Sequence, residues 1–136
     1  MGTYYYVALV TLLTALVYFW MATRVARAHK KAGILAPTMT GDLVLERTVR
    51  AHLNTLEWLP IFLPSMWLFA IYWSSNIAAI LGILWIVGRI VYFLGYVSDA
   101  NKRFPGFFIR ASAASILLLG AIGRIAYLAW FASVGS

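Results

Sequence analysis

Four long apolar stretches, separated by short polar segments, limit this chain to one class of fold. The stretches cover residues 4–26, 46–73, 77–97 and 107–131. Each has about the 20 residues that an α-helix needs to cross the hydrocarbon core of a bilayer. A transmembrane β-strand would need only about ten residues of alternating polarity, and the stretches do not alternate in that way. We therefore predict an all-α membrane protein with a single domain, residues 1–136, built as a bundle of four transmembrane helices.

The composition and the connecting segments agree with this prediction. Hydrophobic residues make up 63% of the chain and charged residues only 11%, whereas soluble domains carry about 25% charged residues. The segments at 31–45, 72–76 and 99–106 contain the glycine, proline and serine residues that are typical of loops and turns. Because Pro105 cannot continue a helix, we expect the third helix to end before it. The chain has no cysteine, which excludes disulfides, thiolate metal sites and a cysteine nucleophile.

The basic residues predict how the helices are oriented. The net charge is +7. Nine of the eleven lysines and arginines lie beside the first and third connecting segments: Arg24, Arg27, Lys30, Lys31, Arg47, Arg50, Lys102, Arg103 and Arg110. Since basic residues are retained on the cytoplasmic side of a membrane, we expect both basic segments in the cytoplasm and both termini outside. This orientation accounts for the charge, so we expect no nucleic-acid partner.

The second stretch carries polar side chains that orientation does not explain. In ERTVRAHLNTLEWLP, residues 46–60, the helical repeat places four polar side chains on one face: Glu46, Arg50, Asn54 and Glu57. They could form an internal network, in which Glu46 pairs with Arg50 and Asn54 bonds to a neighbouring helix. His52 points to the opposite face. A helix with polar groups on two faces should have protein on both sides.

The third stretch carries a second polar face. In GRIVYFLGYVSDANKR, Arg89, Tyr92 and Tyr96 recur at helical spacing, and Arg103 joins them if the helix continues. An aromatic pair at this spacing is often part of a core, but two phenols with two arginines are harder to explain in that way. With Glu57, the two faces would suit a small, mostly anionic ligand that has one cationic group. Glutathione has this pattern, with two carboxylates, one ammonium group and a thiol.

The string E-R-x-x-R-A-H-x-N-x-x-E, followed by RIVYFLGYVSDANKR, resembles the signature of the membrane-associated proteins in eicosanoid and glutathione metabolism, the MAPEG family. The resemblance extends over essentially the whole chain, including its length, its four spans and its long first cytoplasmic loop. It implies a homotrimer of four-helix subunits, with glutathione bound between neighbouring subunits. We expect a bacterial member of the family, located in the inner membrane.

The resemblance also implies roles for individual residues. Carried over by position, the glutathione-binding residues would be Arg50, His52, Asn54, Glu57, Trp58, Tyr92, Tyr96, Arg103, His29 and Lys30. His52 would face the neighbouring subunit, and Trp58 stands where one branch of the family has tyrosine. The catalytic residue would be Arg103, whose guanidinium would favour the thiolate form of glutathione. Glutathione would be a co-substrate, and no metal is expected.

These features predict a membrane-bound glutathione transferase that conjugates glutathione to hydrophobic electrophiles arriving from the lipid. It could also reduce lipid hydroperoxides, because conjugation, isomerisation and peroxide reduction would share the glutathione half of the site. Three alternatives stay open: a non-enzymatic lipid-binding scaffold of the same fold, a small multidrug or proton-coupled transporter that uses Glu57, and a bis-histidine haem protein that uses His29 and His52. Arg124, in the middle of the fourth stretch, has no predicted role.

Overall fold

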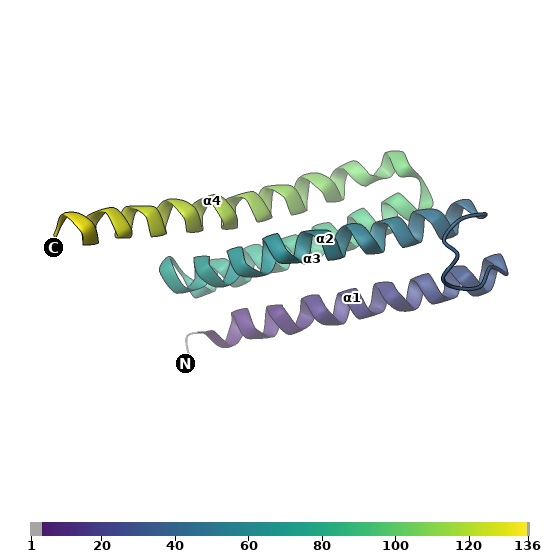
Figure 1. The fold of residues 1–136 in the computed structure, drawn as a ribbon, viewed down its shortest axis with the longest axis horizontal. Helices are drawn as coiled ribbons and strands as arrows, with labels where there is room; N and C mark the ends of the chain where they lie inside the picture. The colour runs from purple at the N-terminus through teal and green to yellow at the C-terminus, as the bar shows by residue number, and fades with distance from the viewer. Residues whose placement is uncertain (1–3, 136) are drawn as a thin grey trace.

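The computed structural model of the protein describes residues 4–135. Its main elements are four long α-helices and one short 3₁₀ helix (Figure 1): α1 (Tyr5–Ala32), α2 (Leu43–Tyr72), α3 (Ser75–Ser98), η2 (Ala100–Arg103) and α4 (Phe104–Val134). All four α-helices are long and apolar enough to cross a membrane. The predicted all-α architecture, with four helices apolar enough to span a membrane, is therefore confirmed for the part of the chain that the structure describes.

The first two helices extend beyond the apolar stretches that predicted them. α1 continues through the basic segment to Ala32, past the predicted limit at residue 26, and Gly33 ends it in the left-handed conformation with φ 71°. α2 begins at Leu43 instead of residue 46, behind Asp42, whose carboxylate caps the helix. Charged side chains are compatible with a helix that leaves the hydrocarbon. An apolar run therefore marks a membrane span and not the end of a helix.

The connection between α3 and α4 decides where Arg103 lies. α3 ends at Ser98, because Asp99 leaves the helix with extended backbone angles (φ −161°, ψ 124°). The helix ends where the predicted connecting segment at 99–106 begins, so the condition under which Arg103 would join the stripe of Tyr92 is not met, and Arg103 lies in η2. Pro105 lies in the first turn of α4, where a helix does not need the missing N–H group. α4 therefore begins at Phe104, three residues before the predicted start.

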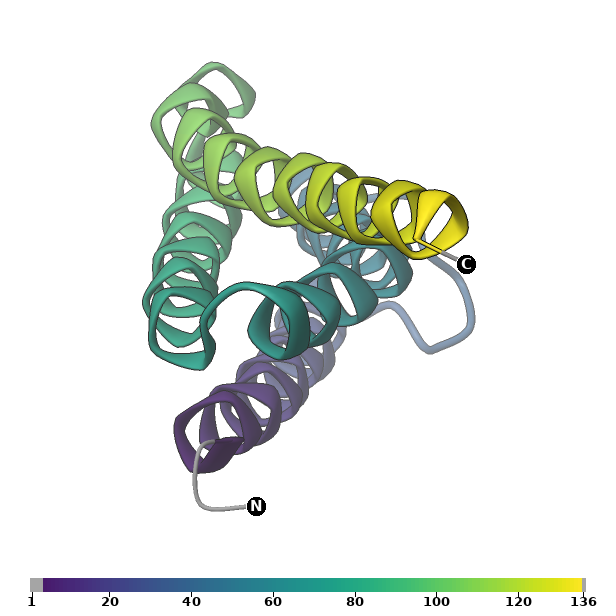
Figure 2. The same ribbon diagram turned by 90° about the vertical axis from the view of Figure 1, so that its left-hand side faces the viewer.

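The helices lie side by side, with α2 and α3 between α1 and α4 (Figures 1 and 2). The α1–α2 loop and η2 lie at one end of the bundle, which we call the basic end because Lys30, Lys31, Lys102 and Arg103 are there. The α2–α3 turn and the outer ends of α1 and α4 lie at the other end, which we call the terminal end. The grouping of the segments follows the sequence prediction, and the side of the membrane that each end faces stays a prediction.

α3 and α4 approach each other closely at two glycines. A Cβ atom on Gly106 would overlap the Tyr92 backbone, and a Cβ atom on Gly88 would lie 2.6 Å from the Arg110 backbone nitrogen. Small residues let the backbones of membrane helices come together in this way. The contact, which we call the α3–α4 seam, brings Arg110 beside Arg89 and Tyr92.

The outside of the bundle is apolar. Large hydrophobic side chains are exposed on all four helices, for example Phe19, Ile80 and Leu119. The packed interior includes Phe62 and Trp85, whose rings stack with centroids 3.9 Å apart. Such a surface is expected where helices face lipid or another copy of the protein.

Arg124, which had no predicted role, ties two helices together at the terminal end. Its Nε donates a hydrogen bond to the Tyr72 carbonyl oxygen at 3.1 Å, and its guanidinium lies 5.0 Å from the ring centroid of Trp73. The Trp73 indole N–H in turn donates to the carbonyl oxygen of Gly120 at 2.7 Å. The last carbonyl groups of a helix lack partners within it and attract a cation. Arg124 therefore stabilises the end of α2 against α4.

Candidate functional site

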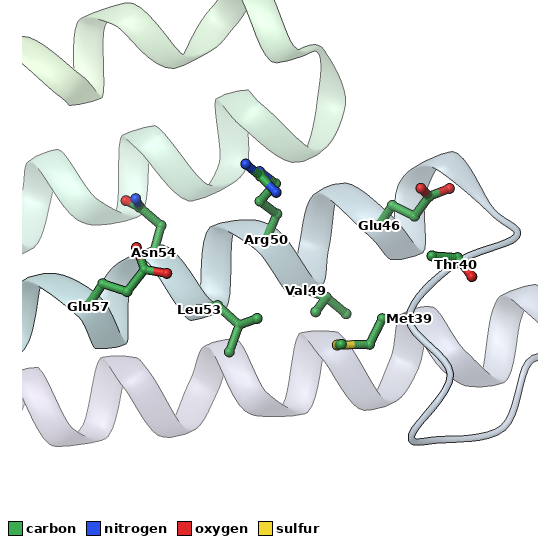
Figure 3. A pocket seen from close by; sticks show the side chains of 8 residues that line it. All are labelled: Met39, Thr40, Glu46, Val49, Arg50, Leu53, Asn54 and Glu57. Atoms are coloured by element: carbon green, nitrogen blue, oxygen red, sulfur yellow. The ribbon is translucent and has the colours of Figure 1, made fainter.

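A cleft of about 340 Å³ opens along the predicted polar face of α2. Figure 3 shows the eight residues that line it: Met39 and Thr40 from the α1–α2 loop, and Glu46, Val49, Arg50, Leu53, Asn54 and Glu57 from α2. This volume is within the usual range for small-molecule sites, about 300 to 1,000 Å³. The prediction that the four polar residues share one face is confirmed, and the face borders a hollow of suitable size.

The charged groups of the cleft are not paired with one another. Glu46, Arg50 and Glu57 are exposed, and none of them forms a hydrogen bond or an ion pair through its side chain with another residue in the range 4–135. In Figure 3 the side chain of Arg50 points away from Glu46. The pairing of Glu46 with Arg50 that the sequence left open is therefore not formed. The cleft presents a free guanidinium, which can bind a carboxylate, and free carboxylates, which can bind an ammonium group.

Asn54 connects the cleft to the interior of the bundle. Its Oδ1 accepts a hydrogen bond of 3.0 Å from Nη1 of Arg89, and Nη2 of Arg89 donates to Oγ1 of Thr55 at 2.5 Å. Arg89 is 0% exposed. Sequence reasoning placed Arg89 on a face that meets the ligand, and this is wrong, because the guanidinium lies behind Asn54. The sequence also left open an internal network in which Asn54 bonds to a neighbouring helix, and the hydrogen bond to Arg89 of α3 is such a bond.

The predicted tyrosines form a second cluster, apart from the cleft. Tyr92 is buried and stacks on Tyr96, with centroids 5.8 Å apart and an interplanar angle of 6°. The guanidinium groups of Arg89 and Arg110 lie 5.0 and 4.8 Å from the Tyr92 ring centroid. Neither tyrosine lines the cleft of α2. Within one chain, the two predicted polar faces therefore do not enclose a common cavity.

Arg110 is the member of this cluster that sequence reasoning missed, because it was counted as a marker of orientation. It is only 3% exposed, and its Nε and Nη1 are buried without a hydrogen-bond partner in the described chain. Its guanidinium also lies 4.9 Å from the ring centroid of Trp58. The sequence did hold one signal: position 110 lies inside the predicted fourth span, 107–131, where a basic residue is no longer a boundary marker.

The contact with Arg110 also explains the tryptophan at position 58. Trp58 is half-buried and turns its ring toward a guanidinium, and the indole ring is the strongest aromatic partner for a cation. Trp58 does not line the cleft of α2. Its predicted contact with glutathione therefore stays a prediction.

The other predicted residues lie outside the cleft, either on another face of α2 or on other elements. His52 points away from the cleft, as predicted, and stacks on Tyr18 of α1 with centroids 4.3 Å apart. His29 and Lys30 border a hollow of about 400 Å³ at the end of α1, where Nδ1 of His29 lies 3.0 Å from the Ile34 carbonyl oxygen. Arg103 is half-buried in η2, with its guanidinium 5.1 Å from the Phe104 ring centroid. Of the ten predicted glutathione-binding residues, one chain thus brings three together in the cleft: Arg50, Asn54 and Glu57.

Comparison with known proteins connects this arrangement to a family. The sequence pattern of the MAPEG family matches residues 7–124. An uncharacterized protein of Synechocystis sp. is 45% identical over 115 residues, which cover 85% of this chain and 84% of that protein. Microsomal glutathione S-transferase 2 of Mus musculus is 39% identical over 119 residues, covering 88% of this chain and 81% of the relative. Leukotriene C4 synthase of Cavia porcellus is 34% identical over 124 residues, covering 91% and 81%.

Proposed function

This chain belongs to the MAPEG family, and from that premise we propose that it is a membrane-bound glutathione transferase. It would bind glutathione as a thiolate and conjugate it to hydrophobic electrophiles. Three of the relatives that it resembles carry the name microsomal glutathione S-transferase 2, at 39%, 37% and 33% identity. With its four helices of membrane-spanning length, it would work in the bacterial inner membrane and take glutathione from the cytoplasm at its basic end.

The observation that carries this proposal is the unpaired charge in the cleft. Arg50 offers a guanidinium fork that fits a carboxylate, and Glu57 offers a carboxylate for the ammonium group of the γ-glutamyl residue. Asn54 lies between them along α2 and adds a carboxamide. Charged side chains along a membrane-spanning helix are unfavourable unless a ligand or a partner binds them. A small zwitterion with two carboxylates supplies the missing partners.

We propose that a second copy of the chain completes the site, within a homotrimer. Five residues that the family resemblance assigns to glutathione lie on other elements, away from the cleft: His29, Lys30, Tyr92, Tyr96 and Arg103. The apolar outer surface of the helices suits packing between subunits. A neighbouring subunit docked over the cleft of α2 would bring such residues to the open side of a bound glutathione.

The hydrophobic substrate would bind beside the cleft. An apolar groove of about 640 Å³ runs between α2 and α4, bordered by Pro60, Pro64 and Ile122 among others. Ile61 and Pro64 of this groove follow Glu57 at helical spacing, so the groove continues the face of α2 that forms the cleft. An electrophile dissolved in the bilayer could thus reach the thiol of a glutathione bound next to it.

In the proposed reaction, Arg103 stabilises the negative charge of the thiolate after the thiol has released its proton to water. A sulfur lone pair forms the new bond to the electrophilic carbon, and the leaving group departs with the electrons of its bond. The protein contributes mainly by stabilising the thiolate and holding the two reactants together. Loss of Arg103 should therefore lower kcat more than it weakens the binding of glutathione.

The test is a titration of glutathione into the detergent-purified protein, with the ultraviolet absorbance of the thiolate as the signal. Arg103→Ala is the test variant, and Lys102→Ala, which removes the neighbouring cation of η2, is the matched control. We expect a saturable signal in the wild type and in Lys102→Ala, and none in Arg103→Ala. A normal turnover rate in Arg103→Ala would contradict the assigned role. A folded wild type that does not bind glutathione would favour the scaffold or the transporter.

A further inference from the structure

We propose that Arg89 is a positioning residue that fixes the carboxamide of Asn54, so that the NH₂ group of Asn54 stays available to donate hydrogen bonds in the cleft. This position then favours a hydrogen-bond acceptor of the ligand, which means a carboxylate or carbonyl oxygen. This inference deepens the proposed function and rests on it for the identity of the ligand. The hydrogen bond between Arg89 and Asn54 does not depend on which ligand binds.

Arg89 is enclosed by the bundle. The side chain is 0% exposed, and its guanidinium lies 5.7 Å and 5.0 Å from the ring centroids of Trp85 and Tyr92. No carboxylate within residues 4–135 forms an ion pair with it. The carboxylate of Glu57 is near enough for its charge to favour the guanidinium, although it forms no ion pair with it. Burial of a charge without an ion-pair partner is unfavourable, and a large apolar side chain would fit a buried helix face better. Unlike an apolar side chain, Arg89 donates two hydrogen bonds to α2.

Arg89 is the donor in both of these hydrogen bonds. Arginine has only donors, so the atoms of Asn54 and Thr55 that meet Arg89 must be acceptors. Oγ1 of Thr55 accepts from Arg89 and donates its own proton to the Ala51 carbonyl oxygen at 3.0 Å. Oδ1 of Asn54 accepts from Nη1 at 3.0 Å. The donor and the acceptor of each hydrogen bond are therefore fixed. If the carboxamide were turned over, its NH₂ group would face Arg89 and could not accept a hydrogen bond from it.

The carboxamide of Asn54 keeps hydrogen-bonding capacity that a ligand can use. Arg89 occupies one lone pair of Oδ1, and the NH₂ group of Asn54 has no partner among the described residues. Asn54 lines the cleft between Arg50 and Glu57. Two donors in that position attract an acceptor and repel a donor such as an ammonium group. Arg89 therefore contributes to selectivity without contacting the ligand.

The experiment combines two double-variant cycles on the full-length protein in detergent micelles. Each cycle uses the wild type, Arg89→Met, Asn54→Ala and the double variant. The first cycle measures the free energy of unfolding without ligand, and the second measures the dissociation constant of glutathione. Thr55→Val is the matched control, because it removes the other acceptor of Arg89 and leaves the bond to Asn54.

We expect the unfolding equilibrium constants to show a coupling of about tenfold between Arg89 and Asn54, the size of one hydrogen bond to a charged group. In the binding cycle, Arg89→Met alone should weaken glutathione binding about tenfold, and Asn54→Ala should add little to it. Thr55→Val should lower stability and keep the dissociation constant within about threefold, since Asn54 stays oriented.

Each outcome decides between named alternatives. Absence of coupling in the unfolding cycle would overturn the positioning role, whatever glutathione does. Additive losses in the binding cycle would also overturn it, because Arg89 would then act independently of Asn54. Coupling in the unfolding cycle, together with a wild type that does not bind glutathione, would support the Arg89–Asn54 arrangement and contradict the proposed function.

Discussion

The two ends of the bundle each hold arginine within helices of membrane-spanning length, and they use its charge differently. At the terminal end, Arg124 bonds to a backbone carbonyl group of α2 and lies over Trp73, so its contacts serve to join two helices. Toward the basic end, Arg89 bonds to Asn54, which lines the cleft, and Arg110 lies over Trp58 and Tyr92. An arginine in a helix of membrane-spanning length therefore indicates function only through its partners.

The largest effect should come from breaking the contact that creates the cluster at the basic end. In Gly106→Ala, the added methyl group would overlap the backbone of Tyr92 and approach the Gly88 carbonyl oxygen, and backbone atoms cannot move aside as flexible side chains can. We expect a loss of about 3 kcal/mol in the free energy of unfolding, at the upper end of overpacking effects. Thermal denaturation followed by circular dichroism would measure it.

Gly123→Ala is the matched control for this prediction, because a Cβ atom there would meet no atom within 4 Å. Alanine is the better helix former, so we expect a gain of up to about 1 kcal/mol. Equal destabilisation by the two substitutions would show that the α3–α4 seam is not a close contact.

The next effect separates activity from stability at the basic end. Arg110→Met should lower kcat/KM for glutathione conjugation about tenfold, because Trp58 and Tyr92 lose the cation that holds them. The free energy of unfolding should stay the same or rise by about 1 kcal/mol, since a buried guanidinium with unpaired nitrogens is removed. Steady-state kinetics and denaturation of the same preparation would test both parts. A variant that loses stability and keeps its activity would reverse the assignment.

Arg124→Met should show the opposite pattern. We expect the free energy of unfolding to fall by about 1 to 2 kcal/mol, because the Tyr72 carbonyl group loses its hydrogen bond. The value of kcat/KM should stay within about twofold, since Arg124 does not line the cleft and has no contact with its residues. If Arg124→Met abolished activity in a folded protein, the distinction between the two ends would fail.

The smallest effect is expected at Trp58. Trp58→Phe keeps an aromatic ring but gives Arg110 a weaker partner, and we expect a two- to fourfold decrease in kcat/KM, about the difference between an indole and a phenyl ring. Trp130→Phe is the control, because Trp130 is exposed near the terminal end. Kinetics that change equally in both variants would mean that Trp58 acts through general packing and not through Arg110.

The sequence predicted the number of helices from the length of the apolar stretches and the polar face of α2 from the helical repeat, because both are local properties of the chain. It left the place of Arg103 open, because periodicity does not say whether a helix continues, and a single residue, Asp99, ends α3. It also missed Arg110, since closeness to a basic loop along the chain does not reveal that α4 turns this residue inward. In each case a residue was judged by its own helix alone.

By itself, the sequence determined four apolar helices, their connections and the sharing of one face by Arg50, Asn54 and Glu57. A helix repeats every 3.6 residues and a bilayer requires about 20 apolar residues, so these properties follow from composition and spacing. Only the tertiary structure decided that Asn54 is held from behind by Arg89, and that Arg110 lies against Tyr92. Those contacts depend on how closely α3 approaches α2 and α4. Packing at small residues sets these distances, and the repeat of a single helix carries no information about them.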